Sequence, residues 1–183
     1  GILNDAGGTL MVSESSVSQN TSNRAGGGIE DNSGAGTILT LTDVTMDENS
    51  TGAAPGNGGG LHITGPGDSR ISGGTVSNNT ASAEGGGLWN GSGTMTVDNV
   101  MINGNTGSGD DADQGGGGLF NNGGTLIVQN STISNNIADG SSGSGGGILN
   151  VTGGMLTVEN TTLSGNTSNR AGGAIEDNSG SST

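Results

Sequence analysis

Three side chains of catalytic type lie close together at His62, Asp68 and Arg70. An imidazole, a carboxylate and a guanidinium on one outer face are the groups that acid–base cleavage of a polysaccharide would require. A working site needs further carboxylates on neighbouring strands, and the sequence aligns none there and contains no lysine that could act as a base. We therefore expect no enzymatic activity, and a polysaccharide-active enzyme is only the second alternative.

An acidic segment, GDDADQG at 109–115, brings Asp110, Asp111 and Asp113 into one short loop. Several oxygen ligands at a compact site are what Ca²⁺ prefers, so these carboxylates form a weak calcium candidate. The segment lacks a distal bidentate glutamate and occurs once in the chain. A solvated acidic insertion is the favoured interpretation, and we predict no obligatory cofactor, with calcium as the open possibility.

Trp89 and Phe120 are the only tryptophan and phenylalanine, and the chain has no tyrosine. Each follows a glycine cluster and one aliphatic residue, a position that Leu3 and Leu149 also occupy. Side chains here should point outward and stack about 5 Å apart, the strand spacing. Three interpretations stay open: the preceding loop buries the aromatic rings, they pack against another protein chain, or they form a surface patch that grips a glycan.

The elements that would position these residues come from a repeat. Glycine clusters recur at intervals of 27–32 residues along the whole chain. Each is followed by an aliphatic residue, then by an alternating apolar pair such as Leu126 and Val128, then by an aliphatic residue three positions before an asparagine. Short alternating runs bounded by Gly, Asn, Asp and Ser are typical of strands and turns.

This period predicts an all-β fold, a single-stranded parallel β-helix with three short strands in each coil of 27–32 residues. Roughly seven coils would stack at about 4.8 Å per coil. The third coil has Ser69 and Ile71 where others have Leu and Val, followed by two glycines, and we expect a distorted second strand there.

Each coil also places one asparagine at the end of its third strand. We predict that these side chains point inward and form a hydrogen-bonded ladder along the axis, as stacked asparagines do in other parallel assemblies. The ladder residues are Asn20, Asn49, Asn79, Asn105, Asn136 and Asn166.

A longer repeat is superimposed on the coils. TSNRAGGGIEDNSG at 21–34 returns as TSNRAGGAIEDNSG at 167–180, and 24 of the 37 residue pairs between 1–37 and 147–183 are identical. We interpret residues 1–183 as one continuous solenoid segment of a longer array, with a super-repeat at 1–146 and the next copy beginning at 147. The duplicated Arg24 and Arg170 should pair with carboxylates of the following strand.

Composition excludes several classes of function. The chain has 3 basic and 17 acidic residues, a net charge of −14, and no cysteine. Such a surface repels phosphate backbones, so we expect no nucleic-acid partner. No apolar run approaches the length of a membrane span.

The paired motifs, GGAI at 172–175 and aliphatic-x-x-Asn, resemble the repeats of bacterial polymorphic outer membrane proteins. The longer phrase GGGILN…GGMLTVENTTLSGNT at 145–167 is similar to the right-handed β-helix repeats of large secreted bacterial surface proteins. The resemblance implies right-handed coiling and a secreted, extracellular or cell-surface location in a bacterium. The function that follows is a structural fibre, stalk or adhesin rod that associates with itself. The first alternative is a glycan-binding adhesin that uses Trp89 and Phe120.

Overall fold

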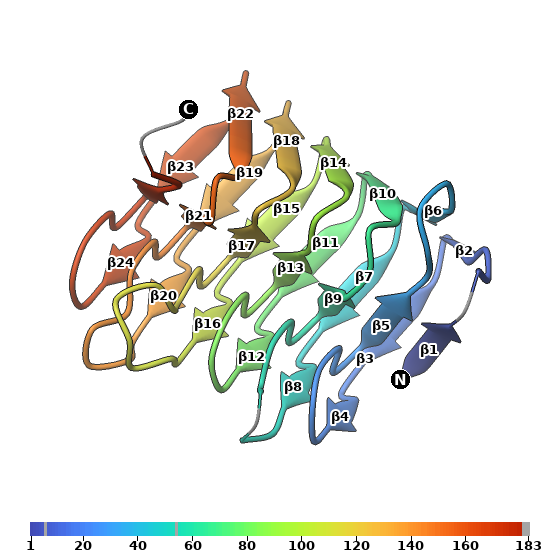
Figure 1. Cartoon of the computed structure of the whole chain (residues 1–183), viewed down its shortest axis with the longest axis horizontal. Helices are drawn as coiled ribbons and strands as arrows, with labels where there is room; N and C mark the ends of the chain where they lie inside the picture. Colours follow the sequence, from blue (N-terminus) through green and yellow to red (C-terminus); the bar gives the residue numbers. More distant parts are fainter. Residues whose placement is uncertain (6, 54, 181–183) are drawn as a thin grey trace.

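The computed structural model describes residues 1–5, 7–53 and 55–180, which form strands and no helix. All strand pairs are parallel, and each strand inside a sheet pairs with its equivalents one turn before and one turn after it, whereas the first and last strands of each sheet have one neighbour. Followed from the N-terminus, the chain rises along the near face, crosses over and returns along the far face while it advances along the axis (Figure 1). This is the right-handed parallel β-helix predicted from the repeat.

The strands stack into four sheets, which we call A to D in the order in which each coil enters them. Sheet A comprises β1 (Ile2–Asp5), β5 (Ile29–Asn32), β9 (Leu61–Ile63), β13 (Leu88–Asn90), β17 (Leu119–Asn122), β21 (Ile148–Val151) and β25 (Ile175–Asn178). Sheet B comprises β2 (Met11–Ser13), β6 (Ile38–Thr42), β10 (Asp68–Ser72), β14 (Thr94–Asp98), β18 (Thr125–Gln129) and β22 (Met155–Glu159). Sheet C comprises β3 (Ser16–Ser18), β7 (Thr45–Asp47), β11 (Thr75–Ser77), β15 (Met101–Asn103), β19 (Thr132–Ser134) and β23 (Thr162–Ser164).

Sheet D was not anticipated from the sequence, which indicated three strands per coil. It follows the ladder asparagines directly, and each of its strands has two residues: β4 (Thr21–Ser22), β8 (Ser50–Thr51), β12 (Thr80–Ala81), β16 (Thr106–Gly107), β20 (Ile137–Ala138) and β24 (Thr167–Ser168). Two residues are too few for a period-two pattern, which explains why the pattern gave no signal. The described chain makes six turns through all four sheets, and β25 begins a seventh.

The core is a narrow column of stacked aliphatic side chains inside these sheets. In sheet C the register pairs Val17 with Met46, Met46 with Val76, and Ile102 with Ile133, as the repeat predicts. Most of these side chains are fully buried and belong to one continuous cluster. Each coil contributes only a few apolar residues, so a chain with 27% hydrophobic residues can still build a continuous core.

The third coil is more regular than its sequence suggests. β10 spans five residues and pairs in full register with β6 and β14, so the prediction of a distorted strand was wrong. The irregularity is confined to Ser69, whose buried hydroxyl replaces an aliphatic side chain and has no hydrogen-bond partner. Backbone pairing with both neighbours holds the strand straight, because main-chain hydrogen bonds do not depend on that side chain.

The corner between sheets B and C explains a second recurrent polar position. Glu14, Asp43, Asn99, Asn130 and Asn160 all occupy it, with φ between 45° and 57°. Asparagine and aspartate tolerate this left-handed conformation better than β-branched or bulky residues do. The corner therefore selects these residue types for backbone geometry.

Candidate functional site

The outer face of sheet A carries the residues that the sequence singles out for binding. The register pairs Leu3 with Glu30, His62 with Trp89, Trp89 with Phe120, and Phe120 with Leu149. The predicted outward column is therefore confirmed. Because neighbouring strands of one sheet stack equivalent side chains, the column becomes a row of rings.

The rings of this column lie face to face. His62 and Trp89 stack with ring centroids 4.2 Å apart and an interplanar angle of 24°, and Trp89 and Phe120 stack at 6.0 Å and 6°. Leu149 and Val151 extend the apolar cluster to the next coil. We call His62, Trp89, Phe120, Leu149 and Val151 the outer cluster.

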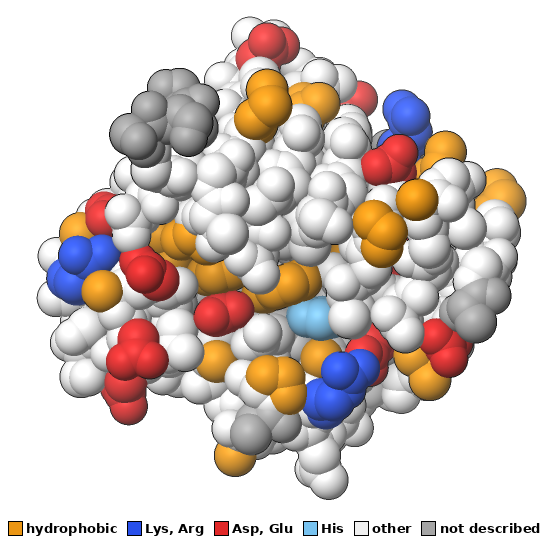
Figure 2. All heavy atoms as spheres, in the orientation of Figure 1, with side chains coloured by type: hydrophobic (Ala, Val, Ile, Leu, Met, Phe, Trp, Pro, Cys, Tyr) orange, Lys and Arg blue, Asp and Glu red, His pale blue; other side chains and the backbone are white. Residues whose placement is uncertain are grey.

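The outer cluster is covered, which agrees with the first of the three interpretations left open, burial of the rings by the preceding loop, and disagrees with a surface contact patch at Trp89, Phe120 and Leu149. Only 6% of Trp89, 2% of Phe120 and none of Leu149 is exposed, whereas Leu3 at the end of the column is 65% exposed. Figure 2 views this face and shows the histidine and hydrophobic side chains at the bottom of a hollow between polar loops. The loops that precede the glycine clusters rise beside the strands, so the cluster is a small satellite core under loops.

One loop residue that sequence reasoning missed anchors this cover. The Trp89 indole Nε1 donates a hydrogen bond of 3.0 Å to Glu84 Oε2, from the loop before β13. The preceding turn needs Gly85, which has φ of 65° and where an added Cβ would lie 3.0 Å from the Trp89 Cβ. The sequence signal was a glutamate five residues before the only tryptophan, a spacing that has no meaning until the loop is seen to fold back.

Burial sets the charge state of the cluster. Desolvation, followed by the nearby Arg24 guanidinium, lowers the pKa of His62 from 6.5 to about 4. The imidazole is therefore neutral at pH 7, and its Nδ1 shares a 2.9 Å hydrogen bond with the Thr64 hydroxyl. Burial raises the pKa of Glu84, while the hydrogen bond from Trp89 opposes that shift.

These shifts make the outer cluster acid-sensitive. Because the pKa of His62 is lowered from 6.5 to about 4 in the folded state, the unfolded state binds more protons than the folded state between these two pH values. The stability that neutral His62 allows is complete above pH 6.5 and falls by about 3 kcal/mol as the pH drops to 4. Glu84 acts in the opposite sense, since its raised pKa makes the folded state bind a proton more readily.

We expect the free energy of unfolding of the His62→Gln variant to fall less between pH 7 and pH 4 than that of the parent chain, because the variant lacks the imidazole that must stay neutral when buried.

The emission of Trp89, the only tryptophan, reports directly on this cluster. Denaturant titrations at pH 7 and pH 4, followed by Trp89 emission, measure the difference. Carboxylates elsewhere contribute equally in both proteins and cancel. Equal acid sensitivity of the His62→Gln variant and the parent chain would contradict the assignment of the effect to His62.

His62, Asp68 and Arg70 do not form a joint site. His62 lies under the loops of sheet A, whereas Asp68 and Arg70 are exposed on β10 of sheet B. The Asp68 Oδ1 accepts a 2.8 Å hydrogen bond from the Thr94 backbone N–H in the neighbouring coil. The three side chains therefore occupy separate places in the solenoid and share no groove.

The carboxylates of the acidic insertion also go to separate partners. Asp110 Oδ1 accepts a 2.8 Å hydrogen bond from the Ser141 backbone N–H, which lowers the pKa of Asp110, and Asp113 accepts one from Asn178. Across the described ranges, no group of three or more His, Asp or Glu side chains is placed to hold a metal ion. The weak calcium candidate at Asp110, Asp111 and Asp113 is therefore not supported.

The predicted asparagine ladder is confirmed, and it continues through all six coils. Each amide donates to the Oδ1 of the next ladder asparagine at 2.9–3.0 Å, from Asn20 through to Asn166. The same Oδ1 also accepts a hydrogen bond from the backbone N–H of the preceding ladder asparagine. Asn49, Asn79, Asn105 and Asn136 are completely buried, so the ladder satisfies polar groups at a corner that water cannot reach.

A second ladder at the end of sheet A was missed. Asn90 donates to Asn121, and Asn121 donates to Asn150, both at 2.7 Å. Asn4 donates to Asp31, and Asn150 to Asp177, in the two copies of the duplicated sequence. The signal was present as an Asn or Asp two residues after each cluster aliphatic, broken at Ile63.

The duplicated arginines make the predicted loop–strand ion pairs. Arg24 pairs with Glu30, and Arg170 pairs with Glu176 at 3.3 Å. The following aspartate of each copy, Asp31 or Asp177, instead accepts from an asparagine one coil before it. Partly exposed pairs of this kind contribute little stability on their own.

Comparison with known proteins adds no family assignment. No protein-family model, no curated protein and no solved structure matches the chain. Within the described residues there is no helix of the length and apolar character that a membrane span requires. The strand pairing alone establishes the parallel β-helix.

Proposed function

We propose that this protein is a structural rod segment of a secreted bacterial surface fibre, stalk or adhesin, related to the polymorphic outer membrane protein repeats that its motifs resemble. Its partner is another copy of the same solenoid, stacked end to end. The rod gains length by adding coils, and its stiffness comes from backbone hydrogen bonds that run along the axis.

The junction between the two super-repeat copies carries this proposal. β21, the first strand of the second copy, pairs with β17 in full register, and Asn136 of the first copy donates to Asn166 of the second. Residues 147–183 repeat residues 1–37 and are bonded to the coil that ends at residue 146. The first coil of the chain therefore has the residue types that a copy of the preceding coil would need in order to pair with it. The same contacts can therefore join any number of copies.

The N-terminal coil has the donor that such stacking needs. Asn49 Nδ2 donates to the Val17 carbonyl oxygen in the coil before it, and later ladder asparagines do likewise. In the first coil Asn20 Nδ2 turns to the Ser18 carbonyl oxygen of its own coil. If another coil were stacked before the first one, the Asn20 amide could donate to a carbonyl oxygen of that coil, as the later ladder asparagines do.

The alternatives require surfaces that are covered or divided. A glycan-binding adhesin needs accessible rings at Trp89 and Phe120, and the loops bury both. A polysaccharide-active enzyme needs a shared groove at His62 and Asp68, which lie on different sheets. The burial of the two rings and the separation of His62 from Asp68 therefore support the rod rather than either alternative.

Particle length tests the proposal. Chains that carry one, two or three additional copies of residues 1–146 ahead of the full sequence should lengthen by about 24 Å per copy, five coils at the strand spacing. Negative-stain electron microscopy and solution X-ray scattering measure this increment. Particles that grow in width, or that collapse into independent globules, would exclude a continuous rod.

A further inference from the structure

The acidic insertion reaches farther along the solenoid than the other side-chain contacts of the described residues. Those contacts join residues of one coil or of adjacent coils, up to 35 positions apart. The Arg170 guanidinium, in contrast, donates to the Ala112 carbonyl oxygen at 3.0 Å, 58 positions away, and Asn178 donates to Asp113, 65 positions away. The insertion therefore spans two coil spacings.

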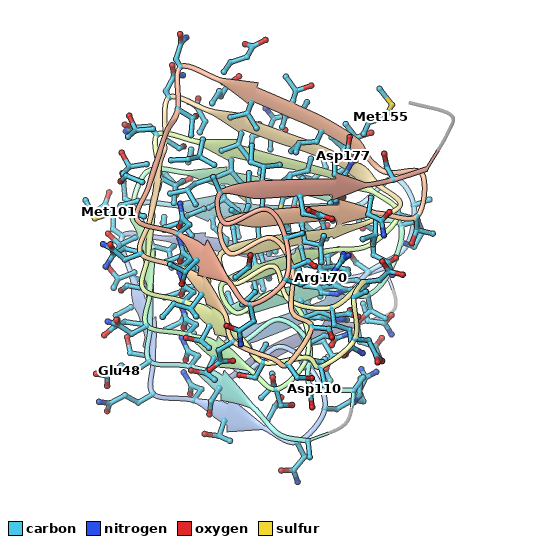
Figure 3. All side chains as sticks on the ribbon, turned by 90° about the vertical axis from the view of Figure 1, so that its left-hand side faces the viewer. Glu48, Met101, Asp110, Met155, Arg170 and Asp177 are labelled. Atoms are coloured by element: carbon cyan, nitrogen blue, oxygen red, sulfur yellow. The ribbon has the colours of Figure 1, made fainter. Side chains whose placement is uncertain are left out.

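The insertion is held in this extended position by its own turn and by the loop it crosses. The Gln114 backbone N–H donates to the Asp111 carbonyl oxygen at 3.0 Å, which closes a turn at the tip. Asp110 accepts from the Ser141 backbone N–H in the next loop along the axis. Figure 3, which looks along the solenoid, places Asp110 and Arg170 away from the face that carries Met101.

Arg170 is the centre of the receiving surface. Its Nε donates to the Ser144 hydroxyl at 2.9 Å, and its Nη2 reaches both Ala112 and Glu176. One guanidinium thus connects loops of three successive coils, a use that depends on its fixed fork of donors.

These contacts cross the boundary between the two super-repeat copies. The insertion belongs to the copy at 1–146, and Arg170 and Asn178 belong to the copy that begins at 147. Their counterparts in the first copy are Arg24 and Asn32. The Arg24 side chain is 57% exposed against 39% for Arg170, and Asn32 donates to Asp5 at 2.9 Å.

We propose that the acidic insertion at 109–115 is a clasp that locks each super-repeat onto the following one, and that Arg24 and Asn32 are the receiving site for the clasp of another copy of this chain. This inference rests on the proposed rod function, since it names the partner and the residues of the junction. Each copy supplies a clasp about one coil before its end and a receiving arginine at the end of its first coil, so that the two lie two coils apart across the junction. The junction is thereby closed by side chains as well as by strand pairing.

Hydrogen exchange on the full chain tests the clasp, with a matched arginine as control. Arg170→Gln should speed exchange in β24 and β25 by about tenfold, because it removes a charge-assisted bond across the junction. Arg24→Gln removes only the equivalent pair with Glu30 and should change exchange in β4 and β5 by less than about twofold.

A second pair of variants tests the clasp from the side of the insertion. Asp113→Ala should speed exchange in β24 and β25 as Arg170→Gln does, and Asp111→Ala in the same loop is its control. Equal effects of the two arginine variants would overturn the clasp.

A tandem chain tests the receiving site. Residues 1–146 are placed once more ahead of the full sequence, with Asp113→Cys in the first unit and Asn32→Cys in the second. The chain has no native cysteine, so a short bifunctional thiol reagent joins only the introduced pair. We expect cross-linking as efficient as between Asp113→Cys and Asn178→Cys in the single chain. An elongated tandem without the cross-link would overturn the clasp and leave the rod standing, whereas a tandem that does not elongate would contradict both.

Discussion

Asn105→Ala should destabilise the solenoid by about 3–5 kcal/mol, because a fully buried amide with four hydrogen bonds is lost at the centre of the ladder. The Asn105 Nδ2 donates to the Val76 carbonyl oxygen and to Asn136 Oδ1, both at 2.9 Å. Its Oδ1 accepts from the Asn79 backbone N–H at 3.0 Å and from Asn79 Nδ2 at 2.9 Å. Alanine leaves these groups buried without their partner.

Urea titration followed by far-ultraviolet circular dichroism measures this loss. The control is Asn122→Ala, since Asn122 is half-buried at the outer end of β17 and belongs to neither ladder. We expect that control to change the free energy of unfolding by less than about 0.5 kcal/mol. If the two variants unfolded at the same urea concentration, the ladder would not be a major source of stability.

Gly117→Ala should cost about 3 kcal/mol or more, because the added methyl group has no space to occupy. A Cβ at this position would lie 2.4 Å from the Ile137 carbonyl oxygen and 2.6 Å from the Gly146 carbonyl oxygen. Both atoms are backbone, so sheet D and the next glycine cluster would have to move. The close packing of successive coils at the glycine clusters therefore depends on the absence of a side chain.

Gly34→Ala is the matched control for this substitution. A Cβ added at Gly34 would meet no atom within 4 Å, and the backbone there has no positive φ. The replacement should be neutral or raise stability by about 0.5 kcal/mol through the unfolded chain. Thermal unfolding of both variants, followed by circular dichroism, checks the contrast, and a harmless Gly117→Ala would show that coils stack more loosely than the structure requires.

The sequence predicts the fold well because the repeat reports every inward position several times. Val17, Met46 and Val76 differ in type, yet their common place before an asparagine predicts one column, and the pairing confirms it. The asparagine ladder follows from the same alignment. Sheet D escaped because its two-residue strands carry no period, and the second ladder escaped because Ile63 and the alternation of Asn with Asp interrupt its column.

The candidate site could be predicted only in part, because burial on an outer face depends on loops. The register of His62, Trp89 and Phe120 follows from the coil period, which fixes neighbours within a sheet. Their cover depends on Glu84 and on the paths of the loops, whose lengths vary from coil to coil. The reach of the acidic insertion to Arg170 likewise joins residues two coils apart, a distance at which the repeat contains no information.

X-ray diffraction from aligned specimens of the tandem chains tests the central claim most directly, since that claim is a rod built by stacking equivalent coils. A meridional reflection near 4.8 Å, parallel to the long direction of the particles, is the expected result. A strand spacing that runs perpendicular to the long direction, or no ordered spacing of this size, would contradict the account.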